Sequence, residues 1–409
     1  MRSSLSRVTT TIVVGLPAAA CASATSPALT TTSPATASLP ATSPPPTSLP
    51  SPAPTPTPIP PGGWSAVEIS GIDWMTGIAE RDGRLVALGT IGEDQLGIAM
   101  AFSDDGQVWT AIDLAAFDLD AAAAGSVSGG EPGFAAIAYP ISGTLSYGPP
   151  VYLFSADGET WEAATPPADC TFSWPAVFGQ LGFVTLGFLC RGEGSYPPGP
   201  LHVLTSVDGR AWTSRLDPER TADGWATDGR RLVLLTNTGS IEPASVWLTD
   251  DLGTTWRYVE TPFPPDVAVY DLIWGHDRYV ATASWLIREG DPDSAICVSA
   301  DGMSWQCEVI AATGDLAHRD NLGGTAVTPT GFISLSASSF GEFNPIEVIM
   351  ARSIDGLTWS FERVREMENL QQHGFVWTSH GLFAWGETTS VNPEDISQPF
   401  IEVHRAPLP

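Results

Sequence analysis

The sequence feature that most constrains the fold is a short pattern, Ser-x-Asp-Gly-x-x-Trp, that recurs six times between Ser103 and Trp359. Five copies fit the pattern fully, and the fourth, at 249–256, contains one additional residue. The closing tryptophans are 44 to 54 residues apart and are Trp109, Trp161, Trp212, Trp256, Trp305 and Trp359. A repeat of this length is typical of the blades of a β-propeller. We therefore predict an all-β fold built from repeated four-stranded units.

Each copy of the pattern is predicted to form a hairpin turn. An aspartate such as Asp157 can accept hydrogen bonds from turn amides, and the glycine that follows it tolerates a positive φ. Apolar runs on both sides, for example 151–154 and 161–164, predict the two flanking strands. We predict that each copy joins the third and fourth strands of a blade, with its tryptophan packed against neighbouring strands.

A second element, an apolar run, precedes each copy and occurs once more after the last copy. Continuous apolar character over four to six residues suits a strand that is covered on both faces, as the second strand of a blade is. Seven runs against six copies leave the last blade without its fourth strand, which residues 64–69 can supply from the other end of the chain. We therefore predict a seven-bladed β-propeller closed by an N-terminal strand. The runs start at Gly83, Gly133, Gly182, Arg231, Arg278, Gly331 and Gly381.

The six copies resemble the Asp-box, or bacterial neuraminidase repeat, of sialidases, sortilin-type receptors, some xyloglucan-degrading hydrolases and photosystem-assembly propellers. The resemblance covers nearly all of residues 64–409. In those families the repeat is a structural turn at the propeller rim, away from the ligand, so it identifies a fold rather than an activity. The resemblance implies a structural role, and no catalytic one, for Asp105, Asp157, Asp208, Asp251, Asp301 and Asp355.

Sialidases also carry an Arg-Ile-Pro motif, an arginine triad and a Tyr/Glu nucleophile pair, and no Arg-Ile-Pro occurs in this sequence. Arginines such as Arg84, Arg210 and Arg352 lie in predicted strands or short turns, which a central triad would not use. We expect no catalytic residue and predict a recognition or scaffolding role. A secreted glycoside hydrolase is the alternative, because that chemistry needs only two suitably spaced carboxylates and the chain has 46 acidic residues.

The ligand-binding side is expected where the long connections between second and third strands, and between blades, come together. Aromatic side chains in these connections can stack on sugars or anchor a partner protein. Each of them could instead fill a gap between blades, so the prediction rests on the set. We expect a glycan or an envelope protein as the partner. The candidate binding residues are Tyr147, Tyr196, Trp285, Arg288, Phe340 and Phe343.

The N-terminus predicts export from the cytoplasm. Residues 1–20 combine two arginines with an apolar stretch, as a signal peptide does. Residues 18–21, Ala-Ala-Ala-Cys, resemble the lipobox of bacterial lipoproteins, and the resemblance implies that Cys21 carries the lipid. Ordinary cleavage after Ala24, which would release a secreted protein, is the alternative.

Residues 21–63 are almost entirely proline, serine, threonine and alanine. Such a segment cannot bury enough apolar surface to fold, and its prolines favour an extended chain. We predict a disordered linker at 21–63 followed by the propeller at 64–409. This organisation places the propeller outside the cytoplasm, attached to the cell membrane through the lipid.

Five cysteines are present, and setting Cys21 aside leaves four that can form two disulfides in an oxidising compartment. Cys297 and Cys307 are equidistant from the glycine of the fifth turn, so we predict that they pair across the third and fourth strands of blade five. Cys170, placed in the connection between blades two and three, is predicted to pair with Cys190 at the end of a second strand. Zinc binding is disfavoured because no Cys-x-x-Cys occurs.

Charge narrows the range of partners. All 18 basic residues are arginines, against 46 acidic residues, which gives a net charge of −28. So acidic a surface repels phosphate backbones and anionic headgroups, so we expect no nucleic-acid partner and no membrane contact beyond the lipid. The histidines form no His-Glu-x-x-His pair and the acidic loop at 289–293 lacks a full calcium ligand set, so we expect no metal and no cofactor. We also expect a monomer.

Overall fold

The structure is a computed structural model of the chain. It describes residues 64–406 except 93–96, 118, 120–121, 143–145, 148–149, 166–169, 174–176, 180–181, 191–200, 218–223, 237–244, 261–262, 264–266, 286–293, 311–321, 323, 339–346, 368–369 and 389–400. The predicted signal peptide, Cys21 and the linker therefore lie outside the described residues, as does the acidic loop at 289–293.

Seven antiparallel sheets make up the described part, and we number them as blades along the chain. Blade 1 contains β2 (Trp74–Arg81), β3 (Arg84–Thr90), β4 (Ile98–Ser103) and β5 (Thr110–Ala111). Blade 2 contains β6 (Ala122–Gly130), β7 (Gly133–Ser142), β9 (Val151–Ser155) and β10 (Glu162–Ala164), with β8 (Ser146–Tyr147) beside β7. Blade 3 contains β11 (Cys170–Ser173) and β12 (Val177–Gly179), both paired with β13 (Gly182–Cys190), then β14 (Leu201–Ser206) and β15 (Thr213–Asp217).

The remaining blades have four strands each. Blade 4 contains β16 (Gly224–Thr227), β17 (Leu232–Thr236), β18 (Ser245–Thr249) and β19 (Arg257–Glu260). Blade 5 contains β20 (Val267–Gly275), β21 (Arg278–Trp285), β22 (Ser294–Ser299) and β23 (Gln306–Ile310). Blade 6 contains β24 (Thr325–Thr328), β25 (Gly331–Ser338), β26 (Glu347–Ser353) and β27 (Ser360–Val364). Blade 7 contains β28 (Leu370–Thr378), β29 (Gly381–Thr388), β30 (Ile401–Ala406) and β1 (Ser65–Val67).

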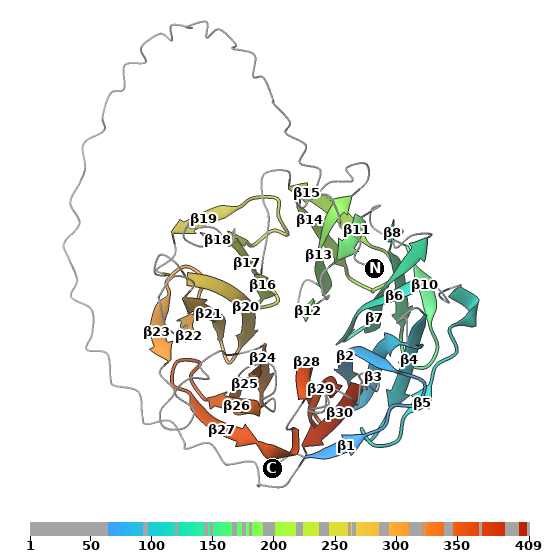
Figure 1. Cartoon of the computed structure of the whole chain (residues 1–409). Coiled ribbons are helices and arrows are strands. Elements are labelled where there is room, and N and C mark those ends of the chain that lie inside the picture. Colours follow the sequence, from blue (N-terminus) through green and yellow to red (C-terminus); the bar gives the residue numbers. More distant parts are fainter. Residues whose placement is uncertain are drawn as a thin grey trace, which may run out of the picture. The chain divides into compact units, whose positions relative to one another are not determined.

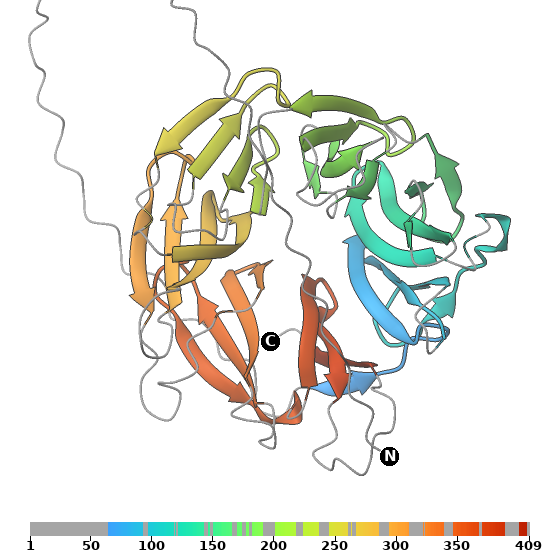
Figure 2. The same ribbon diagram turned by 45° about the horizontal axis from the view of Figure 1, so that its top comes forward.

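The blades follow one another around a ring, with first strands such as β2, β16 and β20 near its centre and fourth strands such as β19 and β23 at its rim (Figures 1 and 2). This arrangement confirms the predicted seven-bladed β-propeller. A ring of this kind leaves only short edges at the rim, which limits uncontrolled strand pairing with other chains.

Second strands are covered on both faces, as their continuous apolar sequence predicts. Every residue of β3 after Arg84 is buried, and Phe134, Leu232 and Phe332 in equivalent strands are at most 1% exposed. The core lies between blades, where for example Leu88 of blade 1 packs in one cluster with residues of blade 2. Full burial of one such side chain contributes about 1.5–3 kcal/mol, so stability depends on each blade covering the next.

The N-terminal strand closes the ring, as predicted. β1 pairs with β30, placing Ser65 opposite Arg405 and Val67 opposite Val403. β1 is thereby the fourth strand of blade 7, although it is shorter than the predicted 64–69. The missing seventh copy of the turn pattern is explained, because the third and fourth strands of this blade come from opposite ends of the described chain.

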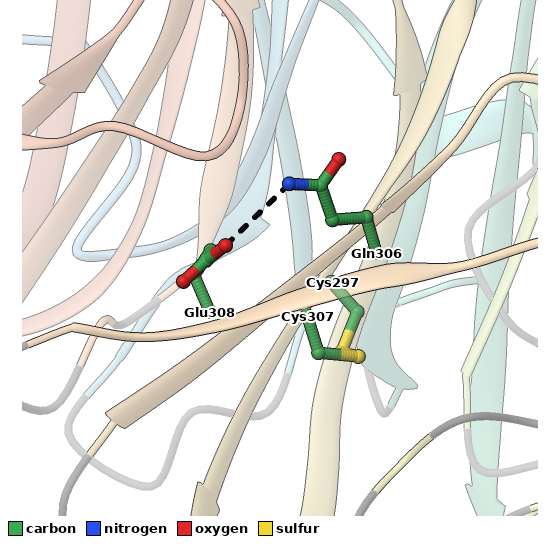
Figure 3. The surroundings of a disulfide bond; sticks show 4 residues. All are labelled: Cys297, Gln306, Cys307 and Glu308. Carbon is green, nitrogen blue, oxygen red and sulfur yellow. Dashed lines mark hydrogen bonds between the residues drawn. A yellow bond between two sulfur atoms is a disulfide. The ribbon is translucent and has the colours of Figure 1, made fainter.

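The two cysteine predictions have different outcomes. Cys297 lies opposite Cys307 on β22 and β23, and a disulfide joins them, with Gln306 and Glu308 on the other face of β23 (Figure 3). Cys170 was expected in the connection between blades 2 and 3 and instead begins β11, directly opposite Cys190 on β13. The connection ends earlier than the sequence suggests because 170–173 pairs along β13. The side chains of Cys170 and Cys190 are not described, so their disulfide stays a prediction.

Helical structure in the described ranges is confined to two short 3-10 turns, η1 (Ala115–Phe117) and η3 (Arg365–Met367). A helix needs about 20 apolar residues to cross the hydrocarbon core of a bilayer. No helix within the described residues has the length and apolar character to do so.

Candidate functional site

The repeated turns, which we call the Asp turns, lie between the third and fourth strands of blades 1 to 6, as predicted; they are 103–109, 155–161, 206–212, 249–256, 299–305 and 353–359. In the first, Asp105 Oδ1 accepts hydrogen bonds from the amides of Gln107 and Val108, both at 2.8 Å. Ser103 Oγ donates to the same carboxylate at 3.1 Å and accepts from the amide of Gly106 at 2.8 Å. The aspartate therefore closes the turn from within.

These hydrogen bonds favour the ionised carboxylates. The amide of Val108 is the main cause that lowers the pKa of Asp105, and the amide of Thr160 is the main cause for Asp157. In the longer fourth turn, the amide and hydroxyl of Thr255 lower the pKa of Asp251 to about 2. Carboxylates held in this way are poorly suited to proton transfer near neutral pH.

Tryptophans complete most of the turns. Trp161, Trp212, Trp305 and Trp359 each donate the indole N–H to the carbonyl of the turn glycine, at 2.9 to 3.2 Å. Trp109 differs, because its buried Nε1 has no hydrogen-bond partner within the described residues. The first Asp turn is therefore less completely satisfied than these four.

Three arginines tie neighbouring blades together at the Asp-turn face. Arg84, Arg231 and Arg278 occupy the same register position, immediately before the residue that pairs with the first residue of an Asp turn. Each donates through Nη1 to the backbone carbonyl of the turn aspartate in the next blade, namely Asp157, Asp301 and Asp355. We call them the latch arginines.

Sequence reasoning missed the latch arginines. An arginine before an apolar run has the same sequence signal whether it faces solvent or the next blade. The available clue was their recurrence at one position of the repeat. Arg84 makes a further bidentate pair with Asp104, at 2.7 and 3.1 Å, and that hydrogen bonding is the main cause that raises the pKa of Arg84.

The junction between blades 7 and 1 uses other groups. His380 Nε2 donates to the carbonyl of Gly83, and Arg405 Nε donates to the carbonyl of His380 at 2.8 Å. Glu80, on the inner strand β2, accepts from the amide of Ser379 at 2.7 Å. The seam of the ring is thus held by side chains from both sides.

Inner strands carry two carboxylates within the described residues, Glu80 on β2 and Asp271 on β20. Glu80 accepts from blade 7 as described, and Asp271 accepts from the amides of Thr325 in blade 6 and Leu272, each at 2.9 Å. Burial raises the pKa of Asp271. The two acids belong to blades 1 and 5, and each connects its blade to a neighbour.

The candidate binding residues are only partly located. Tyr147 ends β8 and pairs with Ile141, and Trp285 ends β21 and pairs with Val267; their side chains are not described. Both backbone positions lie toward the end of the blades opposite the Asp turns. Tyr196, Arg288, Phe340 and Phe343 lie outside the described residues, so the binding rim stays a prediction. Within the described ranges, no group of three or more His, Cys, Asp and Glu side chains could hold a metal ion.

Two surface hollows adjoin the Asp turns of the described part. One, of about 460 Å³, is lined by the loop 81–84 and by Asp104, Phe134, Asp157 and His380. Its cationic groups are already engaged, since Arg84 bonds Asp104 and Glu159 and Arg81 bonds the carbonyl of Ala156. The other, of about 550 Å³, lies between β1 and the first Asp turn.

No protein-family model matches the chain, and no curated protein matches it. Solved structures share its fold. A structure of YCF48 bound to D1 peptide aligns with a TM-score of 0.53 at 13% identity, covering 84% of this chain and 95% of that chain. A prolyl endopeptidase structure aligns with a TM-score of 0.50 at 12% identity, covering 83% and 51%.

A Trypanosoma rangeli sialidase bound to the inhibitor DANA aligns with a TM-score of 0.41 at 11% identity, covering 84% of this chain and 60% of the sialidase. At such identities the likenesses concern the fold and carry no activity with them. The fold therefore defines this chain as a β-propeller protein, and its function must be argued from its own residues.

Proposed function

We propose that this protein is an exported propeller, lipid-anchored at Cys21, that recognises a peptide or protein of the cell envelope without catalysing a reaction. One observation carries the proposal: the two described carboxylates of the inner strands, Glu80 and Asp271, both bond the backbone of a neighbouring blade. A glycosidase needs two carboxyl groups facing one substrate from about 5 to 10 Å apart. Groups committed to separate blade junctions do not provide that arrangement.

The arginines support the same proposal. A carboxylate-binding triad requires guanidinium groups that converge on one ligand. Arg84, Arg231 and Arg278 are instead distributed over three blade junctions and bond backbone carbonyls there.

The partner class follows from charge and from the fold. A net charge of −28 favours a basic or neutral partner. A propeller of similar fold is known bound to a peptide, which supports a peptide as the ligand over a glycan. The predicted contact residues are Tyr147 and Trp285, together with the four candidates in the connections outside the described residues.

Binding and hydrolysis can be tested side by side on the mature chain carrying Cys21→Ser. We expect saturable binding to basic or neutral peptides on an array of envelope-protein sequences, and no release of dye from chromogenic glycosides. Tyr147→Ala and Trp285→Ala should each weaken binding at least tenfold, since aromatic anchors dominate such interfaces.

Tyr258, which is 57% exposed on β19 at the rim, provides the matched control. Tyr258→Ala should leave the affinity unchanged. Glycoside turnover that is lost in Glu80→Gln or Asp271→Asn would overturn the proposal in favour of a glycoside hydrolase.

The anchor has its own test. Wild-type protein should partition with membranes, and Cys21→Ala should release or misprocess it, because the thiol is the only point of lipid attachment in this reading. An intact mass showing an unmodified N-terminus at or beyond Thr25 would contradict the anchor and leave the protein secreted.

A further inference from the structure

The pair Asp-Gly occurs eight times in the sequence. In such a pair the amide nitrogen of the glycine can attack Cγ of the aspartate, because glycine has no Cβ to obstruct the approach. The product is a five-membered succinimide ring, and it forms only when the carboxyl group turns towards the following amide. The structure shows at which pairs that movement is open. It describes seven of them, which begin at Asp82, Asp105, Asp157, Asp208, Asp228, Asp301 and Asp355.

Six of these seven carboxylates are held away from the glycine amide. In each, one carboxylate oxygen accepts hydrogen bonds from the amides two and three residues further along the chain, at 2.6 to 3.0 Å. The glycine amides of three Asp turns are engaged as well, since Gly106, Gly158 and Gly356 each donate to the serine hydroxyl of the turn at 2.8 Å. Attack at any of the six pairs must first break hydrogen bonds that stabilise its turn.

Asp82-Gly83 is the exception. It forms the two-residue turn between β2 and β3, and both residues adopt a positive φ, 50° and 82°. The side chain of Asp82 is 83% exposed, and no backbone amide of the described chain donates to its carboxylate. Arg81 Nε lies 3.2 Å from that carboxylate but does not meet hydrogen-bond geometry. The carboxyl group of Asp82 is therefore free to turn towards the amide of Gly83.

Asp157-Gly158 provides a matched comparison, because Asp82, Gly83 and Asp157 line the same 460 Å³ hollow. A Cβ added to Gly83 would have nothing within 4 Å, whereas one added to Gly158 would lie 3.0 Å from a methyl group of Val86. The amide of Thr160 is the main cause that lowers the pKa of Asp157, which depletes the protonated carboxyl group that loses water. Two copies of one dipeptide thus lie close together, one open to the reaction and one closed.

We propose that Asp82 is a site of spontaneous isomerisation in the folded protein. The nitrogen of Gly83 bonds Cγ of Asp82, and the carboxyl hydroxyl leaves with the amide proton as water. A second water then opens the ring. Opening at Cγ restores aspartate, whereas opening at the original main-chain carbonyl leaves isoaspartate, in which the backbone runs through Cβ and Cγ. No cofactor and no redox partner takes part, and the inference is independent of the ligand proposed above.

The modified turn lies between the two junctions of blade 1. The carbonyl of Gly83 accepts from His380 of blade 7, and Arg84 donates to the carbonyl of Asp157 in blade 2. Isoaspartate lengthens the main chain by one carbon between β2 and β3, which displaces Gly83 from its position opposite His380. We therefore expect the isoaspartyl form to open more readily at the junction of blades 7 and 1.

Incubation of the mature chain carrying Cys21→Ser in water enriched in ¹⁸O measures the reaction. Each ring opening leaves one ¹⁸O atom in the product, whether aspartate or isoaspartate. Cleavage after glutamate yields peptides 81–93 and 132–159, each with one Asp-Gly pair. In the folded protein we expect Asp82 to gain ¹⁸O at least tenfold faster than Asp157. In urea the two rates should agree within about threefold, because the turn hydrogen bonds that protect Asp157 are lost.

Two variants bracket the reaction. Asp82→Asn should form the same ring faster, with loss of ammonia, and Asp82→Glu should gain no label because its ring would have six members. The amide of Ser379, which donates to Glu80 across the junction, should exchange with deuterium at least twofold faster in the isoaspartyl form than in fresh protein. Equal labelling of Asp82 and Asp157 in the folded protein, or an Asp82→Asn chain that keeps its amide nitrogen, would overturn the proposal. Unchanged exchange at Ser379 would overturn its consequence for the seam.

Discussion

Blades with an arginine at the start of the second strand, or directly before it, differ from blades in which the same register position is glycine. Arg84, Arg231 and Arg278 reach across to the next blade, whereas blades 2, 3, 6 and 7 have glycine there and no side chain to extend. The turn before the strand explains the difference. In blade 5 the turn residues His276 and Asp277 take the positive φ values, 49° and 57°. Arg278 is left with an ordinary strand conformation.

In blade 6 the strain falls on the strand itself. Gly331, its first residue, has a φ of 151°, and an added Cβ would collide with the carbonyl oxygen of Ser353. The same register position therefore occurs in two forms. Where the turn residues adopt the positive φ, the position can be an arginine that reaches the next blade. Where the position itself adopts the positive φ, it is glycine and has no side chain to reach across. The repeat specifies the blade, and the turn specifies how that blade is tied to the next.

The largest expected effect is from filling the glycine position. Gly331→Ala should lower the free energy of unfolding by about 3 kcal/mol or more, because it combines a strained φ with a collision against backbone. Gly83→Ala provides the comparison, since Gly83 has a φ of 82° and nothing within 4 Å of an added Cβ. That change should cost only about 1–2 kcal/mol. Urea unfolding measures both, and equal losses would show that the collision does not matter.

Blade 3 has glycine at the latch position, and Arg215 on its fourth strand instead makes a long 3.5 Å hydrogen bond to the carbonyl of Asp251 in blade 4. This blade tests whether a covalent tie within the blade adds to so weak a link. Cys170 and Cys190 are opposite each other on β11 and β13, and a disulfide between them should contribute about 2–4 kcal/mol. Peptide mapping of the non-reduced protein should find a Cys170–Cys190 link beside Cys297–Cys307. Free thiols at 170 and 190, or a Cys170–Cys297 link, would contradict this prediction.

Removing a latch should have a smaller effect. Arg278→Ala removes a 2.8 Å hydrogen bond to the carbonyl of Asp355 and should lower the free energy of unfolding by about 1 kcal/mol. Arg365, exposed in η3, is the control, and Arg365→Ala should stay within about 0.5 kcal/mol of wild type. If Arg278→Ala and Arg365→Ala lower the free energy of unfolding by the same amount, the blades with arginine and the blades with glycine at this position differ only in turn geometry.

The smallest effects are pH-dependent, and two aspartates have opposite signs. The pKa of Asp251 is lowered to about 2, chiefly by the amide of Thr255. Its contribution to stability is present above about pH 4 and is lost as the pH falls towards 2. Burial raises the pKa of Asp271, so the folded state holds its proton more tightly than the unfolded state and stability falls as the pH rises above about 4.

Unfolding of Asp251→Asn and Asp271→Asn between pH 2.5 and 7 measures these contributions. Asp251→Asn should reduce the loss of stability below pH 4. Asp271→Asn should reduce the loss above it, because burial opposes ionisation of Asp271, although the amide of Thr325 in blade 6 favours it. Parallel profiles for both variants and wild type would refute the assignment of either carboxylate.

The fold was predictable because its determinants are local and repeated. Blade number and ring closure followed from a turn pattern that occurs six times, an apolar run that occurs seven times and one remaining strand at 64–69. The Cys297–Cys307 pair followed from the equal spacing of the two cysteines from one turn glycine. Cys170 was misplaced because a short strand next to an irregular connection has little periodicity to detect. The latch arginines and the roles of Glu80 and Asp271 depend on which residues of adjacent blades lie opposite each other. The sequence of a single repeat does not contain this information. The candidate binding rim belongs to connections that vary from blade to blade, so no repeat predicts it.

Closure by β1 has a consequence for the order of assembly. Ser65 pairs with Arg405, 340 positions along the chain. A chain that emerges from its N-terminus presents β1 first and must keep it unpaired until β30 arrives, while blades 1 to 6 can form from neighbouring hairpins in the meantime. Contacts this distant make folding slow, and the seam is the last contact to form. A nascent chain halted shortly before residue 401 would therefore be an open arc of finished blades with an unpaired first strand. Proteases and chaperones would encounter this open form before the ring closes.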